Sequence, residues 1–284
     1  MTILPYFDAP TGSLTYLLID DASHHCAIID PVLDFDQPSG KVRYTSADAL
    51  LAEIDQRSLT LDWILETHVH ADHLTSAHYL HEKTGAPVGI GAEIKSVRHI
   101  FNGIFNIPAS EPPIDTFFNR LLQDGETILV GELEIKVIGT PGHTPACVSY
   151  LCENAVFVGD TLFRADYGTA RTDFPGGDAG TLYDSINKLL SLPDDTQCYF
   201  CHDYPPTDDT PFVYVADLKA QQRDNVQFAH RTREEFIAFR DQRDAGLAAP
   251  RLLYPSIQVN LRAGQLPNPE SNGRMYVKLP LVIA

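Results

Sequence analysis

The chain has 284 residues, of which 44% are apolar and 10% aromatic, so it can bury a sizeable core and is not a disordered segment. Asp and Glu number 38 against 21 Lys and Arg, and the resulting formal charge of −17 disfavours nucleic acid and anionic lipid as partners. The sequence contains neither a run of the ~20 apolar residues that span a membrane nor a basic-then-apolar leader, so we expect a cytoplasmic protein that binds no membrane.

Hydrophobic periodicity in the first half predicts strands with helices between some of them. The segment Asn102 to Asn119 is rich in Pro, Asn and Phe without a clear period, which predicts a long surface excursion. The expected elements are a hairpin of Ser13 to Asp20 with Cys26 to Ile29, a helix from Ser46 to Gln56, a strand from Leu61 to Leu65, a helix from Leu74 to Thr84 that ends at Gly85, and a strand from Val88 to Ile90.

The second half is again rich in predicted strands, and its end is helical and charge-rich. Two strand-rich halves with flanking helices predict a four-layer α/β/β/α sandwich in a single domain over residues 1–284, with an accessory helical segment and final strand at about 213–284. The expected elements are strands at Thr127 to Val130, Leu133 to Ile138, Cys147 to Leu151, Ala155 to Val158 and Gln197 to Cys201, helices at Thr181 to Leu190 and Asp217 to Arg243, and a last strand at Met275 to Ile283.

The densest group of potential metal ligands follows the strand Leu61 to Leu65, in the segment Thr67-His68-Val69-His70-Ala71-Asp72-His73. Three imidazoles and a carboxylate in a tight loop can converge on one point, because metal–ligand bonds offset the entropy lost in ordering the loop. A solvated histidine-rich loop is the alternative. We favour a metal site, because similar ligands recur after other strands.

Three further candidate ligands each follow an apolar strand: His143 after Gly142, Asp160 after Gly159, and His202 after Cys201. Loops at the ends of neighbouring strands lie close together, and ligands are commonly bound there. A lone His or Asp in such a loop would more often serve as a hydrogen-bonding group. Together with the first segment, these residues predict a shared metal centre.

The order His-x-His-x-Asp-His, Gly-His, Gly-Asp and a late His resembles the metal signature of the metallo-β-lactamase superfamily, over about residues 10 to 205. The resemblance implies the α/β/β/α sandwich that the strand pattern also predicts. Asp30, which ends the run Cys26 to Ile29, matches a family position near the metal loop, and a plain turn-capping role is the alternative.

Two glutathione-linked branches of this superfamily fit the ligand set, and other segments must discriminate between them. These segments resemble persulfide dioxygenases, also called sulfur dioxygenases, rather than glyoxalase II enzymes. The loop Asp166 to Ala170 is longer than in the shortest members and resembles a bacterial subgroup of β-lactamase-like hydrolases, which leaves its role open. The discriminating segments are His70-Ala71-Asp72-His73, Gly142-His143-Thr144 with Cys147-Val148, Arg171-Thr172-Asp173-Phe174 and His202-Asp203-Tyr204.

The resemblance implies a non-haem Fe(II) persulfide dioxygenase that converts glutathione persulfide, O₂ and water to sulfite and glutathione. One Fe(II) per chain would be held by His68, His143 and Asp160, with outer positions for His70, Asp72, His73 and His202. The alternative is a dinuclear zinc hydrolase of glutathione thioesters, with His68, His70 and His143 at one Zn(II), Asp72, His73 and His202 at the other, and Asp160 bridging. The resemblance also implies a homodimer.

Glutathione carries two carboxylates, so an acidic protein needs local cations at the mouth of its site. Arg171 follows the ligand Asp160, and Arg223 matches a substrate-contacting region of the family. A guanidinium can bind a carboxylate through two parallel hydrogen bonds, and the hydroxyl of Tyr204 could donate to the tripeptide backbone. Surface ion pairs for the two arginines and a packed tyrosine are the alternatives.

The five cysteines are odd in number and lie mostly in apolar runs, which predicts reduced thiols. Cys198 and Cys201 precede His202 in a C-x-x-C-H pattern that also fits c-type haem attachment or a redox dithiol. In an extended strand, residues three apart face opposite sides, so we expect these two side chains to pack separately. The C-x-x-C-H pattern still leaves a third hypothesis, a metal- or haem-binding redox carrier, which requires Cys198 and Cys201 to be modified and exposed.

Overall fold

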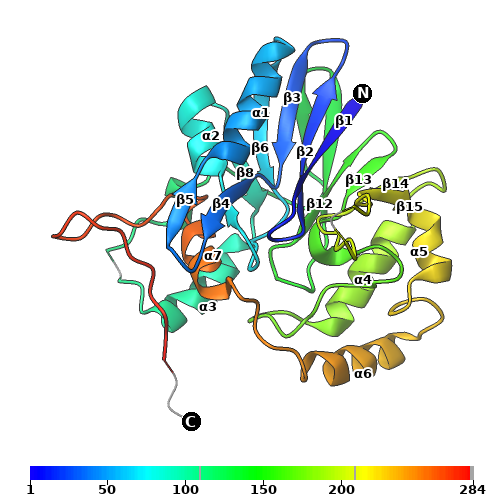
Figure 1. The fold of residues 1–284 in the computed structure, drawn as a ribbon. Helices are drawn as coiled ribbons and strands as arrows, with labels where there is room; N and C mark the ends of the chain where they lie inside the picture. Colours follow the sequence, from blue (N-terminus) through cyan, green and yellow to red (C-terminus); the bar gives the residue numbers. More distant parts are fainter. Residues whose placement is uncertain (109, 208, 282–284) are drawn as a thin grey trace.

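A computed structural model of the chain describes residues 1–108, 110–207 and 209–281 (Figure 1). Its first sheet begins with three antiparallel strands, β1 to β3, and continues with parallel pairing of β3, β6, β8 and β9. The strands of this sheet, in spatial order, are β1 (Thr2–Asp8), β2 (Ser13–Asp20), β3 (His25–Ile29), β6 (Thr60–Glu66), β8 (Val88–Gly91) and β9 (Arg120–Leu122).

The second sheet is antiparallel except where β13 pairs with β14. In spatial order its strands are β10 (Thr127–Val130), β11 (Leu133–Gly139), β12 (Val148–Cys152), β13 (Ala155–Phe157), β14 (Gln197–Tyr199) and β15 (Val215–Asp217). A small third sheet joins β5 (Lys41–Arg43), β4 (Val32–Asp36) and β7 (Leu74–Thr75).

Helices cover the outer face of each large sheet, so the predicted α/β/β/α sandwich is confirmed (Figure 1). Alternate side chains of β2 show why: Leu14, Tyr16 and Leu18 pack between the sheets, whereas Leu17 and Ile19 pack against the first helical layer. That layer contains α1 (Thr45–Gln56), α2 (Ala77–Thr84) and α3 (Ile94–Phe105), with α7 (Leu253–Asn260) beside β7; the other contains α4 (Ala179–Leu190), α5 (Leu218–Asp224) and α6 (Arg233–Asp244). Within the described ranges, no helix has the length and apolar character needed to cross a bilayer.

Three predicted elements differ from the observed ones by more than two residues at a boundary or are divided. The helix expected from Leu74 begins at Ala77, because Leu74 and Thr75 pair with β4. The expected surface excursion contains the end of α3 and a short 3-10 helix, Ile114–Thr116. The single helix expected from Asp217 to Arg243 is divided into α5 and α6, since Asn225 Oδ1 accepts the backbone N–H groups of Gln227 and Phe228 and a capping box at Thr232 starts α6.

The expected final strand, Met275 to Ile283, is absent over residues 275–281, and residues 282 and 283 lie outside the described residues. The backbone N–H and C=O of Lys278 both bond to the side chain of Gln258, at 2.8 Å each, instead of to a sheet edge. Pro280 also has no N–H for a strand ladder. The single-domain boundaries of the chain stay a prediction.

All five cysteines are free and buried, including Cys198 and Cys201, so the exposed pair that the redox-carrier hypothesis requires is not present. Burial raises the pKa of Cys26 and of Cys147 to about 12 and that of Cys152 to about 11.

Because the thiolate is the reactive form, we expect the native protein to resist alkylation by iodoacetamide at pH 8, and all five thiols to react in denaturant. Mass spectrometry of the labelled protein measures this; rapid labelling of the native chain would contradict the buried arrangement.

Candidate metal centre

The candidate ligands lie in loops that leave both sheets at one edge. His68 follows β6, which pairs in parallel with β3 and β8. His143 lies between β11 and β12, Asp160 follows β13, and His202 follows β14, which runs parallel to β13. Because parallel strands end at the same edge, the topology brings together residues that are far apart in the sequence.

His68, His143 and Asp160 form one cluster whose ligand atoms all lie within 4.8 Å of one another. Asp160 Oδ2 lies 3.7 Å from His68 Nε2 and 3.6 Å from His143 Nε2. All three residues are at least nine-tenths buried. The structure therefore places two imidazoles and one carboxylate around a common point, and their role as metal ligands stays a prediction.

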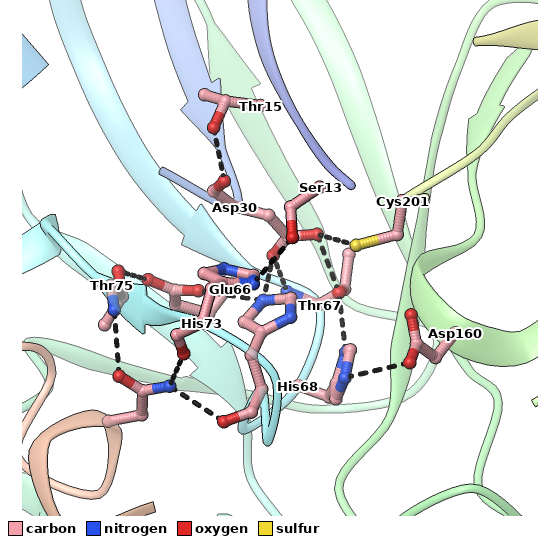
Figure 2. Close-up of polar contacts among 12 residues, drawn as sticks. Ser13, Thr15, Asp30, Glu66, Thr67, His68, His73, Thr75, Asp160 and Cys201 are labelled. Carbon is pink, nitrogen blue, oxygen red and sulfur yellow. Dashed lines mark hydrogen bonds and ion pairs between the residues drawn. The ribbon is translucent and has the colours of Figure 1, made fainter. Parts of the chain in front are cut away.

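The ring of His68 is oriented by Thr67 and Asp30 (Figure 2). Thr67 Oγ1 donates its hydrogen to Asp30 Oδ2 at 2.8 Å. Thr67 Oγ1 is therefore left as the acceptor for the N–H of His68 Nδ1, which lies 3.0 Å away. His68 Nε2 has no hydrogen-bond partner among the described residues. A protonated Nδ1 leaves the lone pair on Nε2, which faces Asp160 and is available to a metal ion.

The ring of His143 is oriented by a backbone carbonyl. Its Nδ1–H donates to the carbonyl oxygen of Arg171 at 2.7 Å, and this leaves Nε2 as the ligand atom. Gly142 allows the approach: its φ is 141°, and a Cβ there would lie 2.4 Å from Cα of Leu182 in α4. Gly159, before Asp160, likewise has a φ of 51° and would place a Cβ 2.6 Å from Thr67 Oγ1. The two glycines let the ligand loops pack closely.

His70 points toward two buried carboxylates instead. Its Nε2 lies 3.0 Å from Asp30 Oδ1 and 3.3 Å from Glu66 Oε2. His70 belongs to two clusters of potential ligands, one with Asp30 and Glu66 and the other with Asp72 and His73. His70 is therefore not part of the cluster of His68, His143 and Asp160, and its Nδ1 is buried without a hydrogen-bond partner among the described residues.

Asp72, His73 and His202 lie on the other side of Asp160. Asp72 Oδ2 is 3.4 Å from both His73 Nδ1 and His202 Nε2, and His202 Nε2 is 3.2 Å from Asp160 Oδ1. Ser13 joins the group from β2, with its Oγ 3.1 Å from His73 Nδ1. His73 Nε2 has no hydrogen-bond partner in the part of the chain that the structure describes.

The charge states suit metal binding. Burial lowers the pKa of His68 well below its ordinary value, and the nearby charge of His70 adds to this effect. A neutral imidazole is the form that binds a metal ion. At Asp160 burial favours the protonated form, but the charge of His202 outweighs it and holds the pKa below its ordinary value. The cluster thus combines a neutral imidazole at His68 with an ionised carboxylate.

The residues present fit a metal ion. Two ligands at about 2.0–2.2 Å from one ion lie roughly 3–3.5 Å apart, close to the separations around Asp160. His68 Nε2 is fully buried and unpartnered within the described residues, which is costly unless a ligand satisfies it. The same donors would suit Fe(II) or Zn(II), so the donor set does not identify the metal.

A cavity of about 350 Å³ opens onto this cluster, within the size range of ligand sites. Asp72, His143, Asp160 and His202 form its floor. The loop Asp166 to Ala170, whose role the sequence left open, contributes Tyr167, Thr169 and Ala170 to the wall. Tyr167 also donates its hydroxyl to the backbone carbonyl of Tyr204 at 2.7 Å, which ties the loop to the segment after His202.

Of the predicted substrate contacts, Arg171 and Tyr204 line the cavity. Arg171 already bonds to Asp173 and to the carbonyl of Ala248, and Tyr204 is half exposed. Arg223 does not line the cavity: it lies at the end of α5, where its exposed guanidinium pairs with Asp224. The structure thus does not bring Arg223 to the cavity, because the chain turns after α5 and residues of α6 line the cavity instead.

Sequence reasoning missed several residues of the site. Arg240 and Arg243 of α6 line the cavity, and Asn260 of α7 donates to the carbonyl oxygens of His70 and His73, at 2.8 Å each. Glu66, directly before the histidine segment, was also missed, although a charged residue at the end of an apolar strand is a usable signal. The other three have none, because their neighbours come from tertiary packing.

The family model of the Metallo-beta-lactamase superfamily matches residues 9–202 of the chain. A probable metallo-hydrolase of Burkholderia pseudomallei is 46% identical, over 99% of this chain and 99% of its own length. Hydroxyacylglutathione hydrolase of Vibrio cholerae is 31% identical, over 79% of this chain and 73% of its own. The crystal structure of ETHE1 from Myxococcus xanthus has a TM-score of 0.74 and 32% identity, and the match covers 93% of this chain and 100% of that one.

Proposed function

The chain belongs to the metallo-beta-lactamase superfamily, and from this premise we propose that it is an iron-dependent persulfide dioxygenase acting on glutathione persulfide. The proposed reaction takes glutathione persulfide, O₂ and water to glutathione, sulfite and two protons. The outer sulfur is oxidised, O₂ is reduced, and the sulfur–sulfur bond breaks. We propose a cytoplasmic location, and the implied homodimer stays a prediction.

One observation carries the proposal: His68, His143 and Asp160 form a ligand cluster of their own, while His70 bonds through Nε2 to Asp30 and belongs to other clusters. Two histidines and one carboxylate on one face are typical of non-haem Fe(II) oxygenases, because the opposite positions stay open for O₂ and substrate. A bound Fe(II) would supply the reactivity toward O₂ and sulfur.

The surrounding residues would orient the substrate and handle the released protons. His202 Nε2 lies 3.4 Å from Asp72 Oδ2, so this pair can hold a proton at the cavity floor. Tyr204 and Arg171 line the wall and carry hydrogen-bond donors suited to a peptide and a carboxylate. Arg243 is the solvent-exposed cation of this wall, since Arg240 is buried in an ion pair and Arg171 is bonded to Asp173.

Arg243→Gln is expected to raise KM for glutathione persulfide roughly tenfold with little change in kcat, because it removes one charge-assisted hydrogen bond worth about 1.4 kcal/mol in substrate binding. Arg223→Gln is the matched control: it also removes an exposed helical arginine, but one outside the cavity, so its KM should stay unchanged. Steady-state O₂ consumption measures both variants. A KM for Arg243→Gln equal to that of the parent protein would exclude Arg243 as a group that binds the substrate carboxylate.

The second candidate function is a dinuclear zinc hydrolase of glutathione thioesters. The cluster of His70, Asp72 and His73 favours it, because a second metal ion would need further ligands beside the first set. The names of the two similar proteins, a metallo-hydrolase and hydroxyacylglutathione hydrolase, also support this reading. In this alternative His70 is a metal ligand, which makes it the residue that discriminates between the two functions.

Metal analysis of the anaerobically purified protein and of His70→Ala tests the proposal. We expect about one iron per chain in both proteins, because a site of two histidines and one carboxylate does not include His70. Two zinc ions in the parent protein and a loss of zinc in His70→Ala would refute the dioxygenase and support the hydrolase.

A further inference from the structure

Helix α6 contains a buried ion pair between Arg240 and Asp244, which are 1% and 3% exposed. The Arg240 guanidinium donates to both carboxylate oxygens of Asp244, and also to Gln227 Oε1 at 2.5 Å and to the carbonyl oxygen of Thr169 at 3.3 Å. Burial lowers the pKa of Arg240, although the charge of Asp244 opposes this. A buried charge pair is costly unless other polar groups satisfy it, so its neighbours define what it holds in place.

The neighbours of this pair flank Arg171. Asp244 Oδ2 accepts the backbone N–H of Thr172 at 2.8 Å and the hydroxyl of Thr172 at 3.2 Å. Arg240 binds the carbonyl of Thr169 on the other side. The loop that carries the Arg171 carbonyl is therefore tied to α6 at both of its ends.

The connection to the metal centre passes through one peptide unit. The carbonyl of Arg171 and the N–H of Thr172 belong to the same planar trans peptide and point in opposite directions. The carbonyl accepts from His143 Nδ1 at 2.7 Å, and the N–H donates to Asp244 at 2.8 Å. A rotation of this peptide would break both hydrogen bonds together, so the Asp244 carboxylate restrains the carbonyl that orients the His143 ring.

We propose that Asp244 and Arg240 are positioning residues for the metal ligand His143, acting through the Arg171–Thr172 peptide. Histidine ligands commonly donate their second nitrogen to a carboxylate or a carbonyl, and such partners affect metal affinity. In this protein the Arg171–Thr172 peptide lies between the Asp244 carboxylate and the His143 ring. The superfamily match ends at residue 202, so α6 adds a contribution to the metal centre from outside the matched region.

The test measures the affinity of the full-length protein for Co(II), by competition with a chromophoric chelator, together with the ligand-field absorption of bound Co(II). Asp244→Asn is the main variant because it conserves side-chain volume. It replaces one carboxylate oxygen, an acceptor, with an NH₂ group that cannot accept from Thr172 or Arg240. Arg240→Met removes the cation. We expect affinity to fall roughly tenfold in each, with a changed absorption spectrum.

Asp241→Asn and Arg233→Met are matched controls on exposed positions of the same helix, and they should bind Co(II) within about twofold of the parent protein. Circular dichroism at the assay temperature establishes folding, and Asp244→Asn decides the question if Arg240→Met does not fold. A folded Asp244→Asn variant with parental affinity and spectrum would overturn the proposal. It rests on His143 being a ligand and not on the reaction catalysed; unchanged Co(II) binding by His143→Ala would show that the ligand assignment itself is wrong.

Discussion

Replacing Asp160 with alanine is expected to abolish metal binding and, with it, the proposed persulfide oxidation. Asp160 Oδ2 is the one carboxylate oxygen that lies within 4 Å of both His68 Nε2 and His143 Nε2 among the described residues. Without it, two imidazoles remain, and no negative charge in that cluster offsets the charge of a divalent ion. We expect iron content to fall from about one per chain to background.

Asp194→Ala is the control for the loss of one negative charge, because Asp194 is 89% exposed and pairs with Lys219 at the surface. It should retain the iron content and activity of the parent protein. Elemental analysis after desalting, at matched protein concentration, gives the comparison. Iron retained by a folded Asp160→Ala variant would show that the ligand set is wrong.

Replacing Asp30 with alanine is expected to destabilise the metal-free protein by about 3–5 kcal/mol, as for breaking a buried charge pair. Asp30 accepts the backbone N–H of Thr67 at 2.7 Å, the hydroxyl of Thr67 at 2.8 Å, and His70 Nε2 at 3.0 Å. Removal of the carboxylate leaves these donors buried without a partner. The contacts also favour an ordering role over a plain turn cap, since they hold the start of the histidine loop.

Thermal unfolding of the metal-free protein measures this effect, with Asp36→Ala as the control. Asp36 is an exposed acid in the neighbouring strand β4, so its removal should leave Tm nearly unchanged. For Asp30→Ala we expect Tm to fall on the order of 10 °C. A Tm equal to that of the parent protein would mean that Thr67 and His70 find other partners and that Asp30 does not order the loop.

The ligand residues could be predicted because their signals are local. Each follows an apolar strand, and Gly142 and Gly159 directly precede two of the ligands, at positions where a Cβ would lie too close to neighbouring atoms. Local signals could not show which helical arginine, Arg223 or Arg243, lines the cavity. Arg223 and Arg243 both end charge-rich helices, and the turn that Asn225 starts between these helices decides which one reaches the cavity.

The missed helices differ in what the sequence shows. In α3, Ile94, Val97, Phe101 and Phe105 are buried at helical spacing, a pattern that is visible in the sequence when the segment is not divided at Asn102. In α7, Pro255 and two β-branched residues argue against a helix, and the element forms because proline is tolerated in a first turn and Ile257 and Val259 are buried. Tertiary packing therefore decided α7, and local pattern could not.

Oxygen uptake by the anaerobically purified, iron-containing protein on addition of glutathione persulfide tests the proposed function most directly. The account predicts about one O₂ consumed and one sulfite formed per persulfide, as expected of an oxygenase with open positions beside its metal. No O₂ uptake, together with hydrolysis of S-lactoylglutathione by the same preparation, would contradict it.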